Sequence, residues 1–162
     1  MRRLPAISLC LLLVTIPAVA DQHSDDGFVI DRRSYNLGIM GGFAEVVRLG
    51  VKKLALSEVM DPAEMDAVMP HAIEIAERNE VEIWRETDFL VTDLFPHDVA
   101  EGKHVLLIYT GNTLDEYLQL KADKAALVAA GRYEGAAREE IARRFGRLLS
   151  YPEPVIDDLL DK

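Results

Sequence analysis

The sequence predicts a single domain of mixed helix and strand, of the α/β or α+β class, with a mixed sheet of about four strands flanked by about four helices. Stretches with helical and with strand-like periodicity alternate along the chain. Glycine or proline marks most of the changes between them. The chain has 162 residues, 49% of them hydrophobic, which is enough for one domain with a sizeable core. We expect this domain to occupy residues 35–162.

A helix over residues 35–49 and a strand over 51–57 open the predicted domain. Apolar residues recur at spacings of three and four in the helix, and Gly50 follows as the residue that ends it. Three glycines lie within the helix, and each lowers its stability relative to alanine. They either permit close packing of the helix or leave its first turn irregular.

A second helix is predicted over residues 62–79. Asp61 is placed to cap its N-terminus, and a proline occupies the first helical position. Pro70 lies inside and is expected to kink or split the helix. A strand over 81–86 follows. Together with the strand over 51–57, these elements could form one right-handed βαβ unit.

The second half of the chain contributes two more strands and the remaining helices. Residues 89–95 and 104–109 are predicted strands, and the second is continuously apolar, as a strand covered on both faces should be. Helices are predicted over 113–130 and 134–149, each set off by glycine or proline. A short helical segment over 155–160 completes the domain.

Residues 1–20 have the layout of a secretory signal peptide. Two arginines precede an apolar run, and small residues come before position 20. A membrane anchor is the alternative, but the run is about half of the roughly 20 residues that a spanning helix needs. We expect cleavage after Ala20 and a flexible leader over 21–34. Because the signal directs export, the mature chain would be soluble and periplasmic or secreted. Cys10 lies in the apolar run and is removed with the signal, so the mature chain would contain no cysteine.

The net charge of the chain limits the classes of partner that it is expected to bind. The formal net charge is −10 at pH 7, which disfavours binding to nucleic acid and to anionic lipid headgroups. The expected partner is a small molecule or another protein, with no insertion into a membrane after the signal is removed. A mature chain without cysteine also excludes thiolate catalysis and zinc–thiolate sites. No cofactor is assigned.

The turn between the strand over 104–109 and the helix after it is a candidate ligand site. Free amides at a helix N-terminus attract anions, and a glycine lets a ligand approach the backbone. The sequence has no phosphate-loop motif at this turn, so an ordinary capped turn is the alternative. The candidate ligand-binding residues are Thr110, Gly111, Asn112 and Thr113.

Carboxylates around the predicted strand pair 81–86 and 89–95 are the candidate catalytic groups. Asp93 stands out because Val91 and Phe95 flank it on one face of the predicted strand, so its carboxylate lies at an edge or is buried with a partner. Glu86 and Glu58 are the other candidate acids or bases. The spacing matches no metal signature, and solvated loop charges are the alternative. The wider set also contains Asp88, His97, Asp98, Glu101 and His104.

Two further groups of residues are candidates for function. Met60, Met65, Met69 and His71 suggest copper, although methionines four residues apart on a helix usually belong to a core. The helix over 134–149 is rich in arginine, which predicts pairing with acidic residues of neighbouring helices or, alternatively, an anionic ligand.

The first hypothesis is therefore an exported small-ligand-binding or accessory protein of the bacterial cell envelope that is not catalytic. The second is a small periplasmic enzyme. It would use Asp93, Glu86 or Glu58 as acid or base, and the turn over 110–113 would bind an anionic group of the substrate. Copper handling is the third. An enzyme should gather its acids around one pocket.

Overall fold

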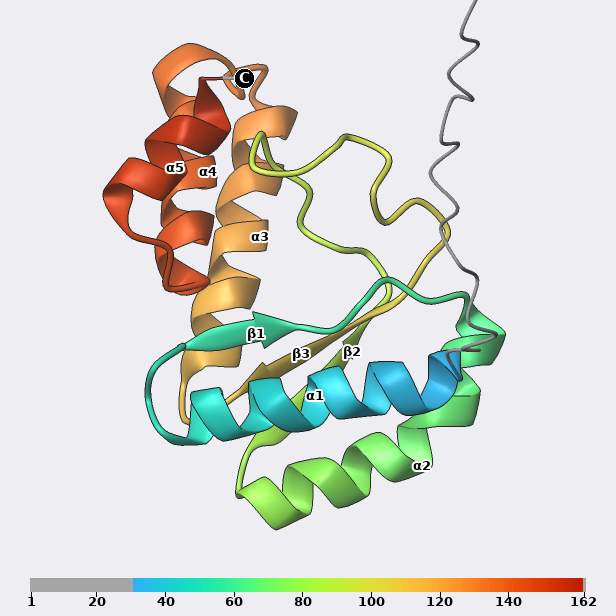
Figure 1. Cartoon of the computed structure of the whole chain (residues 1–162). Coiled ribbons are helices and arrows are strands. Elements are labelled where there is room, and N and C mark those ends of the chain that lie inside the picture. Colours follow the sequence, from blue (N-terminus) through green and yellow to red (C-terminus); the bar gives the residue numbers. More distant parts are fainter. Residues whose placement is uncertain (1–30, 162) are drawn as a thin grey trace, which may run out of the picture.

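The computed structural model describes residues 31–161, which form five helices and a three-stranded antiparallel sheet (Figure 1). This confirms the predicted class of mixed helix and strand. In chain order the elements are α1 (Arg32–Arg48), β1 (Leu54–Leu56), α2 (Pro62–Asn79), β2 (Glu82–Glu86), β3 (Val105–Tyr109), α3 (Thr113–Ala129), α4 (Gly135–Leu148) and α5 (Glu153–Leu160).

The strand order in the sheet is β1-β3-β2, and both pairings are antiparallel. Leu107 of β3 lies opposite Leu56 on one side and Trp84 on the other. The prediction of about four strands in a mixed sheet is wrong in both respects. Because β1 and β2 each run antiparallel to β3, they are parallel to one another, and helix α2 connects them. The predicted βαβ unit is therefore present in a split form, with β3 inserted between its two strands.

The predicted strand over 89–95 is instead part of a long loop, residues 87–104, drawn in yellow-green in Figure 1. Side chains of α3 satisfy backbone groups of this loop that a partner strand would otherwise bind. The Tyr117 hydroxyl accepts a hydrogen bond from the Leu90 amide at 3.0 Å. The Lys124 ammonium donates to the Val91 carbonyl at 2.7 Å. Apolar alternation alone does not reveal this arrangement.

The helices form close to their predicted positions. Helix α1 begins three residues earlier than expected, because the Asp31 side chain accepts a hydrogen bond from the Ser34 amide at 3.3 Å and caps it. Helix α2 continues through Pro70 without being split. The predicted signal peptide and most of the predicted leader lie outside the described residues.

The sheet separates two hydrophobic cores. Helices α1 and α2 cover one face, and α3, α4 and α5 lie on the other side of the sheet (Figure 1). Side chains of β3 alternate between the two cores: Leu106 and Ile108 pack with α1 and α2, and Leu107 packs with α3 to α5. Every residue of β3 is buried, as its continuous apolar sequence predicts.

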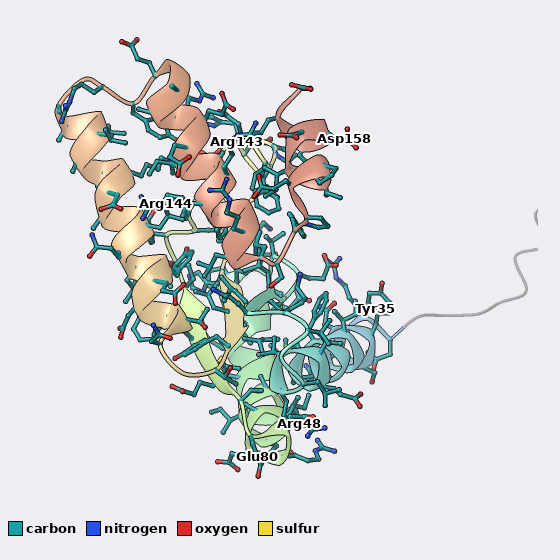
Figure 2. The ribbon with its side chains drawn as sticks, turned by 90° about the vertical axis from the view of Figure 1, so that its left-hand side faces the viewer. Tyr35, Arg48, Glu80, Arg143, Arg144 and Asp158 are labelled. Carbon is teal, nitrogen blue, oxygen red and sulfur yellow. The ribbon has the colours of Figure 1, made fainter. Side chains whose placement is uncertain are left out.

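The arginines of α4 pair within the molecule, which confirms the predicted intramolecular pairing. Arg143 reaches Asp157 of α5 at 2.5 Å, and Arg144 reaches Asp123 of α3 at 2.8 Å. Figure 2 labels Arg143 and Arg144 on α4, which lies between α3 and α5 in that view. These ion pairs join α4 to both of its neighbours, although exposed pairs each contribute little stability. Within residues 31–161, no helix has both the length and the apolar character to cross a membrane.

Candidate functional site

The turn predicted to bind a ligand has its side chains engaged within the protein. The Thr113 hydroxyl donates to the Thr110 carbonyl at 2.9 Å, and the Asn112 amide donates to the Glu116 carboxylate at 3.2 Å. Gly111 has a positive φ of 61°, which fits its place in the turn. The polar side chains of this turn thus hydrogen-bond within the turn and to the first turn of α3.

The structure does not bring the three predicted acids together. Glu86 is buried and forms an ion pair with Lys121 at 3.0 Å. Asp93 lies in the loop 87–104 and pairs with an arginine of α4. Glu58 follows β1 and is exposed. The gathering of acids around one pocket that the enzyme hypothesis requires is therefore not seen.

The remaining members of the acidic and histidine set are also dispersed. His104 accepts a hydrogen bond from Arg85 through Nδ1 at 3.0 Å, and Asp88 lies 3.3 Å from Lys121. Asp98 and Glu101 are exposed. In the part of the chain that the structure describes, no three His, Cys, Asp or Glu side chains are arranged to hold a metal ion.

The methionine group divides between core and surface. Met60 and Met65 are fully buried among apolar residues, and Met69 packs partly buried against the same core. His71 lies on the surface, 3.7 Å from Glu74. The thioethers therefore serve as core side chains in this structure.

A cavity of about 450 Å³, which we call the Asp93 cavity, lies where the loop 87–104 meets α3 and the start of α4. Its volume is within the range of small-molecule sites, about 300–1,000 Å³. The side chains that matter for its chemistry are Asp93, Phe95 and His97 from the loop, Lys124 from α3, Tyr133 from the α3–α4 connection and Arg138 from α4.

Asp93 and Arg138 form a two-point ion pair at one side of this cavity. The Arg138 Nε lies 2.7 Å from one carboxylate oxygen and 3.0 Å from the other, and a terminal guanidinium nitrogen also donates. This pairing raises the pKa of Arg138. Both oxygens of the Asp93 carboxylate are therefore engaged by the Arg138 guanidinium.

Lys124 is the second cation of the Asp93 cavity. Its ammonium donates to the Val91 carbonyl and lies 5.2 Å from the centre of the Tyr133 ring. Burial lowers the pKa of Lys124 and raises that of Tyr133. Among the described residues, no carboxylate oxygen lies within 4.0 Å of the Lys124 ammonium. The carboxylates of Asp88 and Asp93 attract the Lys124 ammonium electrostatically from beyond this distance. Each of them is already in an ion pair, Asp88 with Lys121 and Asp93 with Arg138.

Sequence reasoning found Asp93 but missed Lys124, Tyr133 and Arg138 as its neighbours. A signal for Lys124 was present. It lies seven residues after Tyr117, two turns along the same face of α3, and this spacing alone places its side chain near the buried side of the helix. The positions of Tyr133 and Arg138 depend on how α4 packs, which the local pattern does not specify.

A second cavity of about 300 Å³ lies next to the first, and we call it the apolar cavity. Glu58, which is exposed, lines it together with Ser57 and Tyr151, the two other residues with a polar side-chain atom. The Ser57 hydroxyl is already bonded to the backbone of Glu58 and Leu106. Its main apolar side chains are Phe43, Leu56, Val59, Phe89, Phe95 and Val99.

A larger cavity, of about 540 Å³, is a groove between α3 and α4, and none of its basic residues is a cation without a carboxylate partner in the described structure. Its basic residues already have acidic partners in the described structure: Lys53 lies 4.0 Å from Glu116, and Arg147 lies 2.6 Å from Glu153. Arg144 is paired as described above. We therefore place the candidate site at the Asp93 cavity in spite of its smaller volume.

Comparisons with models of protein families, with curated proteins and with solved structures find no match to this chain. The function of the protein is therefore inferred from the geometry and charge of the site. The Asp93 cavity offers two cations, one carboxylate, an aromatic hydroxyl and an imidazole. Such a set can bind an anionic group through charge-assisted hydrogen bonds.

Proposed function

We propose that this chain is an exported small-ligand-binding protein of the bacterial cell envelope, which binds a small organic or inorganic anion in the Asp93 cavity and does not transform it. The observation that carries the proposal is the Lys124 ammonium, a half-buried cation without a carboxylate partner in the described structure. An anionic ligand would supply the missing partner. The predicted signal peptide supports the assignment to the envelope.

The charge of the cavity differs in sign from that of the whole chain. Lys124 and Arg138 contribute two positive charges and Asp93 one negative charge, while the chain carries −10. A concave site with a local positive excess attracts anions despite the acidic surroundings. Partial desolvation strengthens each hydrogen bond that the cations donate to such a ligand.

Binding is favoured over acid–base catalysis by the state of the carboxylates. Asp93 is held by Arg138, and Glu86 is held by Lys121. Each carboxylate is thus engaged by a cation of the protein, so neither can take a proton from a substrate without breaking its ion pair. Glu58 lies at another cavity, so among the described residues no second carboxylate lines the Asp93 cavity to form a carboxylate pair with Asp93.

The proposal is tested by isothermal titration of the purified protein with phosphate, acetate and succinate. Lys124→Gln should weaken binding of the anion that binds by about 10- to 100-fold, because a hydrogen bond to a charged group contributes about 1.5–3 kcal/mol. Lys52→Gln is the matched control. Lys52 also donates to a carbonyl, at 2.6 Å, and lies 5.1 Å from a tyrosine ring, but it does not line this cavity. Equal losses in both variants, or no anion binding at all, would contradict the proposal.

Asp93→Asn separates the binding and enzyme hypotheses. Removing this carboxylate frees the Arg138 guanidinium and adds one net positive charge to the cavity. We expect anion affinity to rise by about tenfold, or about 1.4 kcal/mol, in the same titration. If Asp93 instead acted as a base on a bound substrate, the variant would lose turnover without this gain in anion affinity.

A further inference from the structure

Phe95 lines both the Asp93 cavity and the apolar cavity. Its ring packs against Phe89 at 5.8 Å and Phe145 at 5.9 Å between centroids, and the side chain is only half-buried. The two cavities are therefore neighbours with one aromatic side chain in their shared wall. Their volumes, about 450 and 300 Å³, are each large enough for part of one ligand.

The two cavities differ in chemical character. The first contains Lys124 and Arg138, whereas the second is lined mainly by aromatic and aliphatic side chains. Glu58, which lines the apolar cavity, repels an anionic group there. A ligand that used both cavities would thus be oriented, with its charged end beside Lys124 and its apolar end beyond Phe95.

We propose that the ligand is an anionic amphiphile, a monocarboxylate with an unbranched apolar tail, whose carboxylate binds in the Asp93 cavity and whose tail passes Phe95 into the apolar cavity. This inference rests on the proposed anion-binding function and specifies its ligand class. The tail gains affinity by leaving water, and the carboxylate sets the direction of binding.

The test is a titration series of straight-chain carboxylates from acetate to decanoate, each below its micelle-forming concentration. Affinity should rise about threefold to fourfold for each added methylene group until the apolar cavity is filled. Decanol, which has the same chain without the charge, should bind at least tenfold more weakly than decanoate.

Substitutions in the wall of each cavity test where the tail and the carboxylate of the ligand bind. Val99→Trp reduces the space of the apolar cavity and should abolish the dependence on chain length while acetate binding is unchanged. Val59→Trp repeats the test from another wall, in case the first variant is unstable, and thermal unfolding checks the fold of each. Val128→Trp is the control, because Val128 is exposed and lines neither cavity. Lys124→Gln should weaken every carboxylate by a similar factor.

The outcomes distinguish this inference from the proposed function. If short anions bind at Lys124 but affinity does not change with chain length, the amphiphile proposal is overturned and the anion-binding function stands. If decanoate binds equally well to folded Val99→Trp and Val59→Trp proteins, the tail lies elsewhere and the proposal again fails. If phosphate binds but no carboxylate does, the amphiphile proposal fails and the anion-binding function stands. If neither phosphate nor any carboxylate binds, both proposals fail.

Discussion

Tyr117 shows how a single side chain fixes the position of the candidate site. It is fully buried in the core between the sheet and α3 to α5, and its ring lies 6.0 Å from that of Phe145. Its hydroxyl accepts the hydrogen bond of the Leu90 amide and lies near the Glu86 carboxylate. The residue thus anchors the loop that carries Asp93 onto α3.

The protonation of Tyr117 makes the stability of the protein depend on alkaline pH. Burial, and after it the nearby Glu86 carboxylate, raises the pKa of Tyr117 far above its usual value of about 10, while its hydrogen bond with Leu90 opposes the shift. The folded state therefore keeps a proton that the unfolded state releases. This contribution to stability is fully present below about pH 10 and is lost as the pH rises further.

We predict that Tyr117→Phe lowers the free energy of unfolding by about 1–3 kcal/mol at pH 7, because the buried Leu90 amide loses its acceptor. Above pH 10 the advantage of the unsubstituted protein should shrink by about 1.4 kcal/mol per pH unit. Urea unfolding from pH 8 to 11 measures both effects. Tyr35→Phe, at an exposed position, is the control. A constant difference between Tyr117→Phe and the unsubstituted protein across this pH range would refute the argument.

Local sequence identified Asp93 but not its partner. The flanking Val91 and Phe95 predicted an acid at a strand edge or buried with a partner, whereas Asp93 lies exposed in a loop and is paired there with an arginine. Its partner, Arg138, is 45 residues away, and its contact depends on how α4 lies against the loop. Side-chain pairs of this kind are set by tertiary packing, which periodicity does not encode.

At the scale of elements, the glycines of α1 and α4 have opposite roles. A Cβ added at Gly38, Gly41 or Gly42 of α1 would meet no other atom within 4 Å, so these glycines do not serve close packing. A Cβ at Gly146 of α4 would lie 2.8 Å from two carbon atoms of the Ile156 side chain. Ile156 is fully buried, so it has little room to move.

We therefore predict that Gly42→Ala stabilises the protein by about 0.5–1 kcal/mol, since alanine loses less backbone entropy in a helix. Gly146→Ala should destabilise it by about 1–3 kcal/mol through overpacking against Ile156. Denaturant titrations of both variants provide the comparison. The packing argument fails if Gly146→Ala is as stable as the unsubstituted protein.

Elements whose signals are local were predicted well. Helix α2 runs over 62–79 as expected, because its first-turn proline is a local feature. Asp61 occupies the predicted N-cap position, but its carboxylate pairs with Lys103 and makes no capping hydrogen bond. The segment 89–95 has the alternation of a strand yet pairs with no strand, since side chains of α3 take its backbone groups. Strand pairing is a non-local property, so a short apolar run cannot specify it alone.

For the whole molecule, β3 is the element that joins two cores. Leu106 and Leu107 are neighbours in sequence and both fully buried, yet they belong to opposite cores because successive side chains of a strand point to opposite faces. The apolar sequence predicted burial on both faces. It did not predict that β3 would separate β1 from β2, because the order of strands depends on how the helices pack.

The shared strand predicts that the two cores unfold together. Leu106→Ala and Leu107→Ala should each lower the free energy of unfolding by about 2–5 kcal/mol. If unfolding is cooperative, Leu107→Ala should reduce the protection of the slowest-exchanging amides in α2 as much as in α4, by about thirtyfold or more. Native-state hydrogen exchange measures this, and Leu106→Ala gives the reciprocal test. Loss of protection in α4 alone would mean that the core of α3 to α5 opens separately. The loop that carries Asp93 would then open with it, while α1 and α2 stay folded on the sheet.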